Sequence, residues 1–426
     1  MKKIKITLLL LLCLMILGLV GCMTKDATMD SDSPIGYEKG YASSSSTEKG
    51  EITPIDGDVE LTEGDDVIPI EGKDDVNQGT VKAGQLTVCA YNDNEEWEYY
   101  QNLITRGQEV GQFYNYQEKY KLANNRVKLT VKDKVNAKIS LLDNEDNVEY
   151  TAFSDNFGNV YLFNSEERET YKIKVSYMKD DVQTEKIMEV SNNQEIDLEV
   201  QKKHNNIMQL MFIIDTTGSM GDEITYLQSE VKDVIQKIQA KNDNITIYLA
   251  LMFYRDNGDD YVTRYYDFTT DIDSAIKKLA KESADGGGDF EEAVDVAFQK
   301  AATCQWLTNA STNVVIHIAD APSHDKDVNT WFNAVDKLAS QNVKIINVAS
   351  SGIDKATEYL FRNECIRTGG YYCYLTNDSG IGGNHIDATV REKPTVEYLN
   401  ECLIRLISGI HTGVLEDAKY YKSNQQ

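Results

Sequence analysis

The stretch Asp215-Thr216-Thr217-Gly218-Ser219-Met220 decides the fold of this 426-residue chain because of the segments on either side of it. An apolar run at 207–214 precedes it, and a segment with an aliphatic stripe at helical spacing follows at 224–238. This order predicts a strand, a short polar loop and a helix. The loop therefore lies at the carboxyl end of a strand, where ligands bind in open α/β sheets.

This loop offers hard oxygen donors to a cation. Asp215 supplies a carboxylate, Thr217 and Ser219 supply hydroxyls, and Gly218 allows close approach of the backbone. Oxygen donors without imidazole or thiolate favour Mg²⁺, Mn²⁺ or Ca²⁺ over zinc or copper. The same residue types also cap helices, so the pattern needs support from other parts of the chain.

Two later loops supply that support. An apolar run at 314–319 ends in Asp320, and Gly286-Gly287-Gly288-Asp289 opens another helical segment. Because parallel strands end at the same edge of a sheet, we expect the three loops to converge on one ion. The alternative is that Asp215, Thr217 and Asp320 only cap helices and bind strand-end amides.

Four motifs resemble those of the von Willebrand factor type A (VWA) domain and its metal-ion-dependent adhesion site. They are Asp-Thr-Thr-Gly-Ser-Met at 215–220, Tyr-Arg-Asp at 254–256, Gly-Gly-Gly-Asp at 286–289 and Ala-Asp-Ala-Pro at 319–322. The likeness is to a bacterial and protist branch of the family and covers residues 206–413. It implies an α/β, Rossmann-like fold with a central, mostly parallel sheet. Alternating strand and helix patterns after residue 206 favour the same architecture.

The resemblance also implies which residues hold the ion. In that family the first loop gives a carboxylate and two hydroxyls, here Asp215, Thr217 and Ser219, and a later strand end gives Asp320. The family's threonine position is occupied by Asp289, which we expect to replace it as a ligand. A third acid partly neutralises the ion and weakens its pull on a partner carboxylate. Mg²⁺ is the expected ion, with Mn²⁺ and Ca²⁺ as alternatives.

The first 85 residues indicate export and anchoring. Residues 1–21 carry three lysines followed by an apolar run, which is typical of a signal peptide. Leu19-Val20-Gly21-Cys22 resembles a lipobox, in which Cys22 receives the lipid and becomes the mature N-terminus. A transmembrane anchor is the alternative, but the apolar run is short for one. Residues 22–85, rich in Ser, Asp, Glu and Gly, are predicted to form a disordered acidic tether.

The rest of the chain divides by its hydrophobic pattern. Residues 86–125 are predicted to form a short helical, connecting segment, and 126–203 alternate as expected for a small antiparallel β-sandwich. The run Phe153 to Val160 resembles a signature of Ig-like and carboxypeptidase-regulatory-like modules, which act as spacers. The VWA-like part follows at 206–413, and residues 414–426 form a C-terminal tail.

Charge and cysteine content limit the partners. The formal charge of −26 and the pI near 4.6 argue against nucleic acid and favour divalent cations or basic partners. Five cysteines lie beyond the signal region, at spacings that fit neither a zinc site nor a redox pair. Their disulfide state stays open; they are Cys89, Cys304, Cys365, Cys373 and Cys402.

These observations predict an extracytoplasmic lipoprotein of the cell membrane that binds a protein partner through its ion, without turnover. The residues expected to set partner choice are Tyr254, Arg255, Asp256 and His324. One alternative is an envelope scaffold in which the ion only stabilises the fold. Another is a metal-dependent hydrolase, which is disfavoured because the chain has no nucleophile elbow and no His-Glu-x-x-His helix.

Overall fold

The computed structural model describes residues 81–421, except for short gaps at 108–110, 203–204 and 242–243. These residues belong to one compact unit, 74–426. The predicted signal peptide, the predicted lipidation site Cys22 and nearly all of the predicted tether lie outside the described residues. Within the described part of the chain, we find no helix with the length and apolar character needed to cross a membrane.

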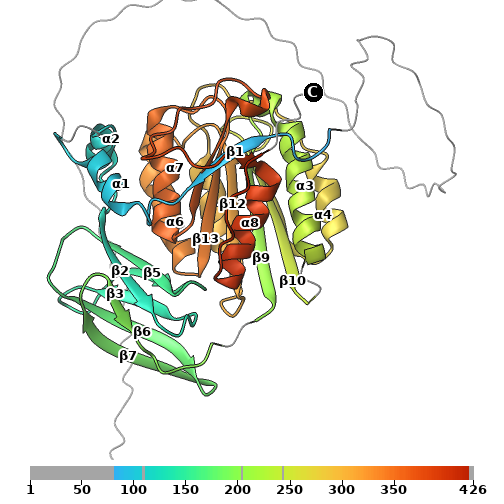
Figure 1. The fold of residues 1–426 in the computed structure, drawn as a ribbon. Helices are drawn as coiled ribbons and strands as arrows, with labels where there is room; N and C mark the ends of the chain where they lie inside the picture. The colour runs from blue at the N-terminus through green and yellow to red at the C-terminus, as the bar shows by residue number, and fades with distance from the viewer. Residues whose placement is uncertain (1–80, 108–110, 203–204, 242–243, 422–426) are drawn as a thin grey trace, which may run out of the picture. The chain divides into compact units, whose positions relative to one another are not determined.

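An eight-stranded sheet forms the centre of the fold, in the order β11-β10-β9-β12-β13-β14-β1-β15 (Figure 1). The five strands from β10 to β14 in this order are parallel, and β11, β1 and β15 add antiparallel edges. The predicted mostly parallel fold is therefore confirmed. The strands are β1 (Thr87–Tyr91), β9 (Ile207–Asp215), β10 (Thr246–Tyr254), β11 (Thr263–Thr269), β12 (Thr312–Ala319), β13 (Val343–Ala349), β14 (Tyr371–Leu375) and β15 (Glu397–Tyr398).

Helices cover both faces of this sheet because successive strand side chains point to opposite sides. Leu210, Phe212 and Ile214 of β9 pack in one core with α3, α4 and α8, whereas Met211 and Ile213 pack in the other with α5, α6 and α7. The helices are α3 (Ile224–Lys241), α4 (Ile272–Leu279), α5 (Val294–Thr303), α6 (Val328–Ala339), α7 (Lys355–Thr368) and α8 (Leu399–Thr412). Single 3₁₀ turns lie at Gly218–Asp222, Asp325–Asp327 and Asn377–Ser379.

The segment expected to be helical from residue 86 begins with a strand instead. β1 pairs antiparallel with β14 on one side and with β15 on the other. Its side chains Val88 and Cys89 are fully buried, each in a different core. Pairing on both edges and burial on both faces explain why Thr87–Tyr91 is extended. Two short helices follow, α1 (Trp97–Ile104) and α2 (Tyr114–Tyr120).

A two-sheet β module follows these helices. Its sheets have the orders β5-β2-β8 and β4-β3-β6-β7. Buried residues of both, such as Leu129 of β2 and Ile173 of β6, belong to one hydrophobic core. The module is not wholly antiparallel as expected, because β2 and β8 pair in parallel. The strands are β2 (Asn125–Val131), β3 (Lys138–Leu142), β4 (Val148–Phe153), β5 (Asn159–Asn164), β6 (Tyr171–Lys179), β7 (Val182–Val190) and β8 (Gln194–Ile196).

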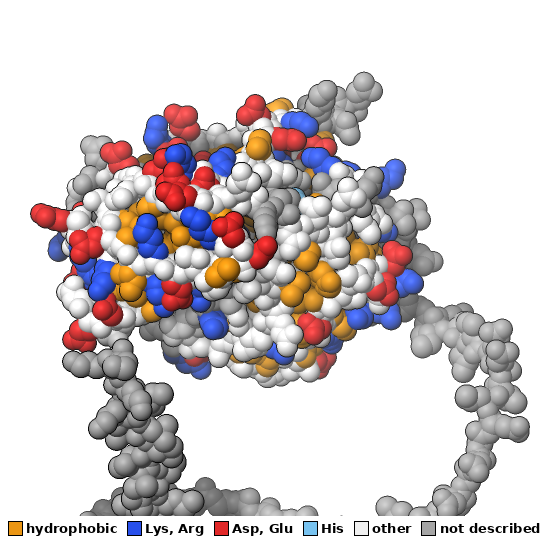
Figure 2. Space-filling model, turned by 90° about the horizontal axis from the view of Figure 1, so that it is seen from below, with side chains coloured by type: hydrophobic (Ala, Val, Ile, Leu, Met, Phe, Trp, Pro, Cys, Tyr) orange, Lys and Arg blue, Asp and Glu red, His pale blue; other side chains and the backbone are white. Residues whose placement is uncertain are grey.

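One face of the molecule carries charged side chains of both signs. Seen from below, the molecule presents Lys and Arg side chains interspersed with Asp and Glu side chains (Figure 2). This face therefore has mixed charge although the whole chain has a formal charge of −26.

One buried carboxylate holds the chain where it enters the sheet. Glu230 of α3 is fully buried and accepts backbone N–H bonds from Gly84 and Gln85 at 2.9 Å and from Leu86 at 3.2 Å. Burial raises the pKa of Glu230, and the three N–H donors oppose that shift. The carboxylate thus fixes the residues that lead directly into β1.

Replacing Glu230 with Ala should lower the stability of the folded chain by about 2 kcal/mol, because three N–H groups lose a charged acceptor. Thermal unfolding followed by circular dichroism measures the change in midpoint. Glu401→Ala, at an exposed position of α8, is the control and should leave the midpoint nearly unchanged. Equal midpoints for the two variants would contradict this role of Glu230.

Candidate metal centre

The candidate site lies where neighbouring strands of the sheet end together. Asp215 is the last residue of β9 and is in register with Tyr254, the last residue of β10. On the other side of β9, β12 ends at Ala319, so that Asp320 follows directly. The sheet topology therefore places the first loop and Asp320 on adjacent strands at the same edge, as the sequence predicted.

The first loop holds Asp215 in a fixed orientation. Oδ1 of Asp215 accepts the backbone N–H of Thr217 at 2.8 Å and the Thr217 hydroxyl at 2.6 Å. The Thr217 hydroxyl also lies 3.2 Å from the Ser219 hydroxyl. Asp215 and Thr217 are buried, whereas Ser219 is exposed. The three predicted donors are thus in contact in the expected order, with Ser219 on the solvent side.

Three carboxylate oxygens near this loop are buried and have no hydrogen-bond partner in the part of the chain that the structure describes. They belong to Asp215 (Oδ2), Asp320 (Oδ1) and Glu292 (Oε2). These side chains are 0%, 4% and 2% exposed, respectively. A buried carboxylate is strongly disfavoured unless it is protonated or meets a positive charge. This donor set of acids and hydroxyls therefore fits a divalent cation.

Burial and mutual repulsion shift the pKa values of these acids in the same direction. Burial, followed by the charge of Asp320, raises the pKa of Asp215. Burial also raises the pKa of Asp320, although a hydrogen bond from Ser219 opposes this shift. Burial and then the charge of Asp215 raise the pKa of Glu292 to about 9. Without a cation, the site therefore favours bound protons.

The glycine loop lies directly against the first loop. The carbonyl of Gly286 accepts the Gly218 N–H at 3.1 Å, and the carbonyl of Thr216 accepts the Asp285 N–H at 3.1 Å. Gly286 has a φ of +77°, and a Cβ there would lie 2.5 Å from the carboxyl carbon of Asp259. Only glycine therefore fits at this position, where the loop passes between Asp259 and the first loop.

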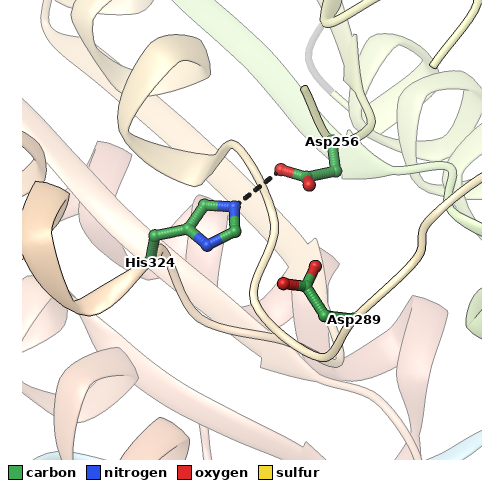
Figure 3. Close-up of side chains that lie close together, drawn as sticks. All are labelled: Asp256, Asp289 and His324. Atoms are coloured by element: carbon green, nitrogen blue, oxygen red, sulfur yellow. Dashed lines mark hydrogen bonds and ion pairs between the residues drawn. The ribbon is translucent and has the colours of Figure 1, made fainter. Parts of the chain in front are cut away.

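Asp289 belongs to a different group of side chains from the three buried acids. It is exposed, and its potential ligand atom lies within 4.8 Å of those of Asp256 and His324. Nε2 of His324 lies 2.8 Å from Oδ1 of Asp256. Figure 3 shows the Asp289 carboxylate facing these two side chains. The structure thus brings Asp289, Asp256 and His324 together on the rim of the site.

Two residues expected to contact a partner are buried. Tyr254 is 0% exposed, and its hydroxyl lies 3.2 Å from Nε2 of His317. Arg255 is 6% exposed, donates to the carbonyl of Ser283 at 3.0 Å and stacks over the ring of Tyr261. The expected partner contact is therefore not possible for these two side chains in this structure. Both side chains instead contact other residues of the chain, His317 for Tyr254 and the Ser283 and Tyr261 loops for Arg255.

Glu292 is the site residue that the sequence reading missed. The sequence predicts a helix from Phe290, which would place Glu292 in its first turn, but α5 begins only at Val294. Glu292 therefore remains in the loop. The sequence feature that could have identified Glu292 as a site residue is the pair of acids, Glu291-Glu292, shortly after the glycine loop.

Proton binding should compete with metal binding at this site. The pKa of Glu292 is raised in the folded chain from its ordinary value of 4.5 to about 9. The protonated side chain therefore contributes fully to folding stability without metal at low pH, and this contribution is lost as the pH rises from 4.5 to about 9. A bound divalent cation replaces the proton, so Mg²⁺ affinity should increase over the same range. Calorimetric titration in buffers of different ionisation enthalpy measures the released protons. Affinity that does not change with pH would contradict this linkage.

Comparisons with known proteins agree with this description of the fold. Residues 209–387 match the family model of the von Willebrand factor A domain. The chain is 28% identical over 196 residues to an ariadne-like RING finger protein of Acanthamoeba polyphaga mimivirus, a match that covers 41% of this chain and 19% of the relative. It is 25% identical over 171 residues to an alpha-protein kinase of Dictyostelium discoideum, covering 40% and 27%. The matches thus span less than a third of either relative.

A solved structure was also found. The conserved hypothetical protein BatB from Bacteroides thetaiotaomicron is 15% identical, with a TM-score of 0.26, and the match covers 50% of this chain and 91% of that chain. The family match, the order of the sheet and the loops at its edge together lead to one conclusion. Residues 209–387 of this chain form a von Willebrand factor A domain.

Proposed function

We propose that this protein is a lipid-anchored binding protein of the cell surface, whose VWA domain recognises a protein partner through a divalent cation and performs no turnover. The observation that carries the proposal is that three buried carboxylate oxygens, on Asp215, Asp320 and Glu292, have no hydrogen-bond partner among the described residues. Buried acids without partners favour a cation, and the exposed residue Ser219 marks the solvent side of the site.

Asp215, Thr217, Ser219 and Asp320 are the residues of this chain that would hold the ion. Mg²⁺ is the proposed ion, with Mn²⁺ and Ca²⁺ as alternatives, because the donors are hard oxygens. When bound, the cation supplies positive charge at an edge that is otherwise acidic. Thr217 orients Asp215 through two hydrogen bonds, so that its second oxygen stays free for the ion.

The relatives support a binding module over an enzyme. One is named a RING finger protein and the other an alpha-protein kinase, and each match covers less than a third of the relative. A domain that is joined to such different proteins fits a recognition role better than a shared reaction. Because one fold can serve many functions, this argument depends on the site as well.

Partner recognition should require the ion. In the full chain, Asp215→Ala should abolish Mg²⁺ binding in calorimetry, whereas Asp273→Ala, at an exposed position of α4, should keep it. Binding of an isolated partner should be lost with EDTA and restored by excess Mg²⁺. Full binding in EDTA would contradict ion-mediated recognition and would favour the envelope scaffold, in which the ion stabilises the fold alone.

The lipid anchor is tested separately from the ion. Cys22→Ala should move the protein from the membrane fraction to the soluble fraction, because the lipid is attached to the Cys22 thiol. Cys304→Ala, which changes a free cysteine far from the signal, should leave the protein in the membrane fraction. Membrane retention of both variants would contradict a lipid on Cys22.

A further inference from the structure

Glu292 is a buried acid that the VWA motifs do not assign to the ion. We propose that Glu292, and not Asp289, supplies the third carboxylate to the cation at Asp215 and Asp320, and that it closes this ion to acidic ligands from outside. The inference rests on the cation of the proposed function. It goes further by naming the internal ligand and the charge of the partner.

The backbone of Glu292 is fixed beside the loop that carries Asp320. Its N–H donates to the carbonyl of Pro322 at 2.9 Å, and Glu292 forms an isolated parallel bridge with Ser323. Pro322 and Ser323 follow Asp320 by only two and three residues. This pairing holds the glycine loop against the loop after β12. The backbone of Glu292 is therefore fixed close to that of Asp320.

The Glu292 side chain extends toward the first loop across Gly287. A Cβ on Gly287 would lie 3.0 Å from Oε1 of Glu292 and 3.4 Å from Cβ of Thr217. Glu292 and Thr217 therefore border the same side of Gly287, and the missing side chain of that glycine leaves them room. The charge of Asp215 acts on Glu292 more strongly than that of any other acid, which agrees with this placement.

The burial of the Glu292 carboxylate favours a bound cation, whereas the exposed Asp289 carboxylate does not need one. Oε2 of Glu292 has no hydrogen-bond partner among the described residues, and the side chain is 2% exposed. Asp289 is exposed to water and faces the imidazole of His324 (Figure 3). Water stabilises an exposed carboxylate, whereas a buried one needs a positive partner.

Three carboxylates carry one negative charge more than a divalent cation can neutralise. With Asp215, Asp320 and Glu292 around it, the ion and its ligands together are negative, so an outside carboxylate gains little from approaching it. The exposed acids Asp222 and Asp289, from the loops after β9 and before α5, add to this negative edge. A partner that docks here therefore offers neutral oxygen atoms to the ion and basic groups to the acidic edge around it.

Two variants of the full chain separate the acids. Glu292→Gln keeps the shape of the side chain but removes its charge, and should weaken Mg²⁺ binding by about tenfold or more in calorimetry, the effect of losing one charged interaction. Asp289→Asn is the matched control from the same loop and should change the affinity by less than about threefold. Glu292→Asp, which retains the charge, should bind Mg²⁺ more tightly than Glu292→Gln.

A second readout tests the closure of the ion. With Mn²⁺ bound, Glu292→Gln should increase the relaxation rate of water protons, because water displaces a neutral amide from the ion more readily than it displaces a carboxylate. Acetate should then lower this rate in Glu292→Gln at concentrations that leave the wild type unchanged. Thermal midpoints near that of the wild type, measured with metal absent, establish that each variant is folded.

The outcomes distinguish this inference from the proposed function. Equal Mg²⁺ affinity for Glu292→Gln and the wild type, or a loss in Asp289→Asn alone, overturns the role of Glu292 while leaving the ion in place. Acetate that binds equally to wild-type and Glu292→Gln protein overturns the closure. A wild-type chain that binds neither Mg²⁺ nor Mn²⁺ overturns the proposed function itself.

Discussion

Repulsion between buried carboxylates at the carboxyl edge of the sheet is the constraint on which the rest of the site depends. Asp215, Asp320 and Glu292 each have one oxygen without a hydrogen-bond partner among the described residues, and each has a raised pKa. Arg255, a buried cation directly after β10, donates to the carbonyl of Ser283 and stacks on the ring of Tyr261 instead. Protons or a metal ion must therefore compensate the negative charge of the three acids.

The loops support one another through backbone N–H groups, which donate to carbonyl groups and to the Asp259 carboxylate. Gly218 donates to Gly286, Asp285 donates to Thr216, and Asp259 accepts N–H bonds from Gly287 and from Asp256. None of these bonds uses the carboxylates of Asp215 or Asp320. The glycines are required because a side chain at Gly286 would collide with Asp259. A framework built from backbone groups and the Asp259 carboxylate can thus keep its shape whether Asp215 and Asp320 hold protons or an ion.

The parts of the fold that sequence could predict are those set by local pattern. Strands such as β10 and β13 are mostly apolar, and Asp215 and Asp320 stand at strand ends, so their convergence follows from parallel pairing alone. Glu292 could not be placed because the start of α5 depends on the pairing of residue 292 with Ser323 from a distant loop. The burial of Tyr254 could not be predicted from local sequence either, because its hydroxyl contacts His317 on another strand.

β1 likewise could not be predicted from local sequence, and it adds a strand from outside residues 206–413 to the sheet of the VWA domain. Its partners, β14 and β15, follow it by more than 280 residues, so nothing local identifies Thr87–Tyr91 as part of the sheet. Leu86 and Val88 are fully buried in the core that α8 also covers. The chain thus enters the sheet at β1, forms the β module, and returns to the sheet through β9. A fragment that begins at Asn206 would expose one edge of β14 and leave part of that core unfilled.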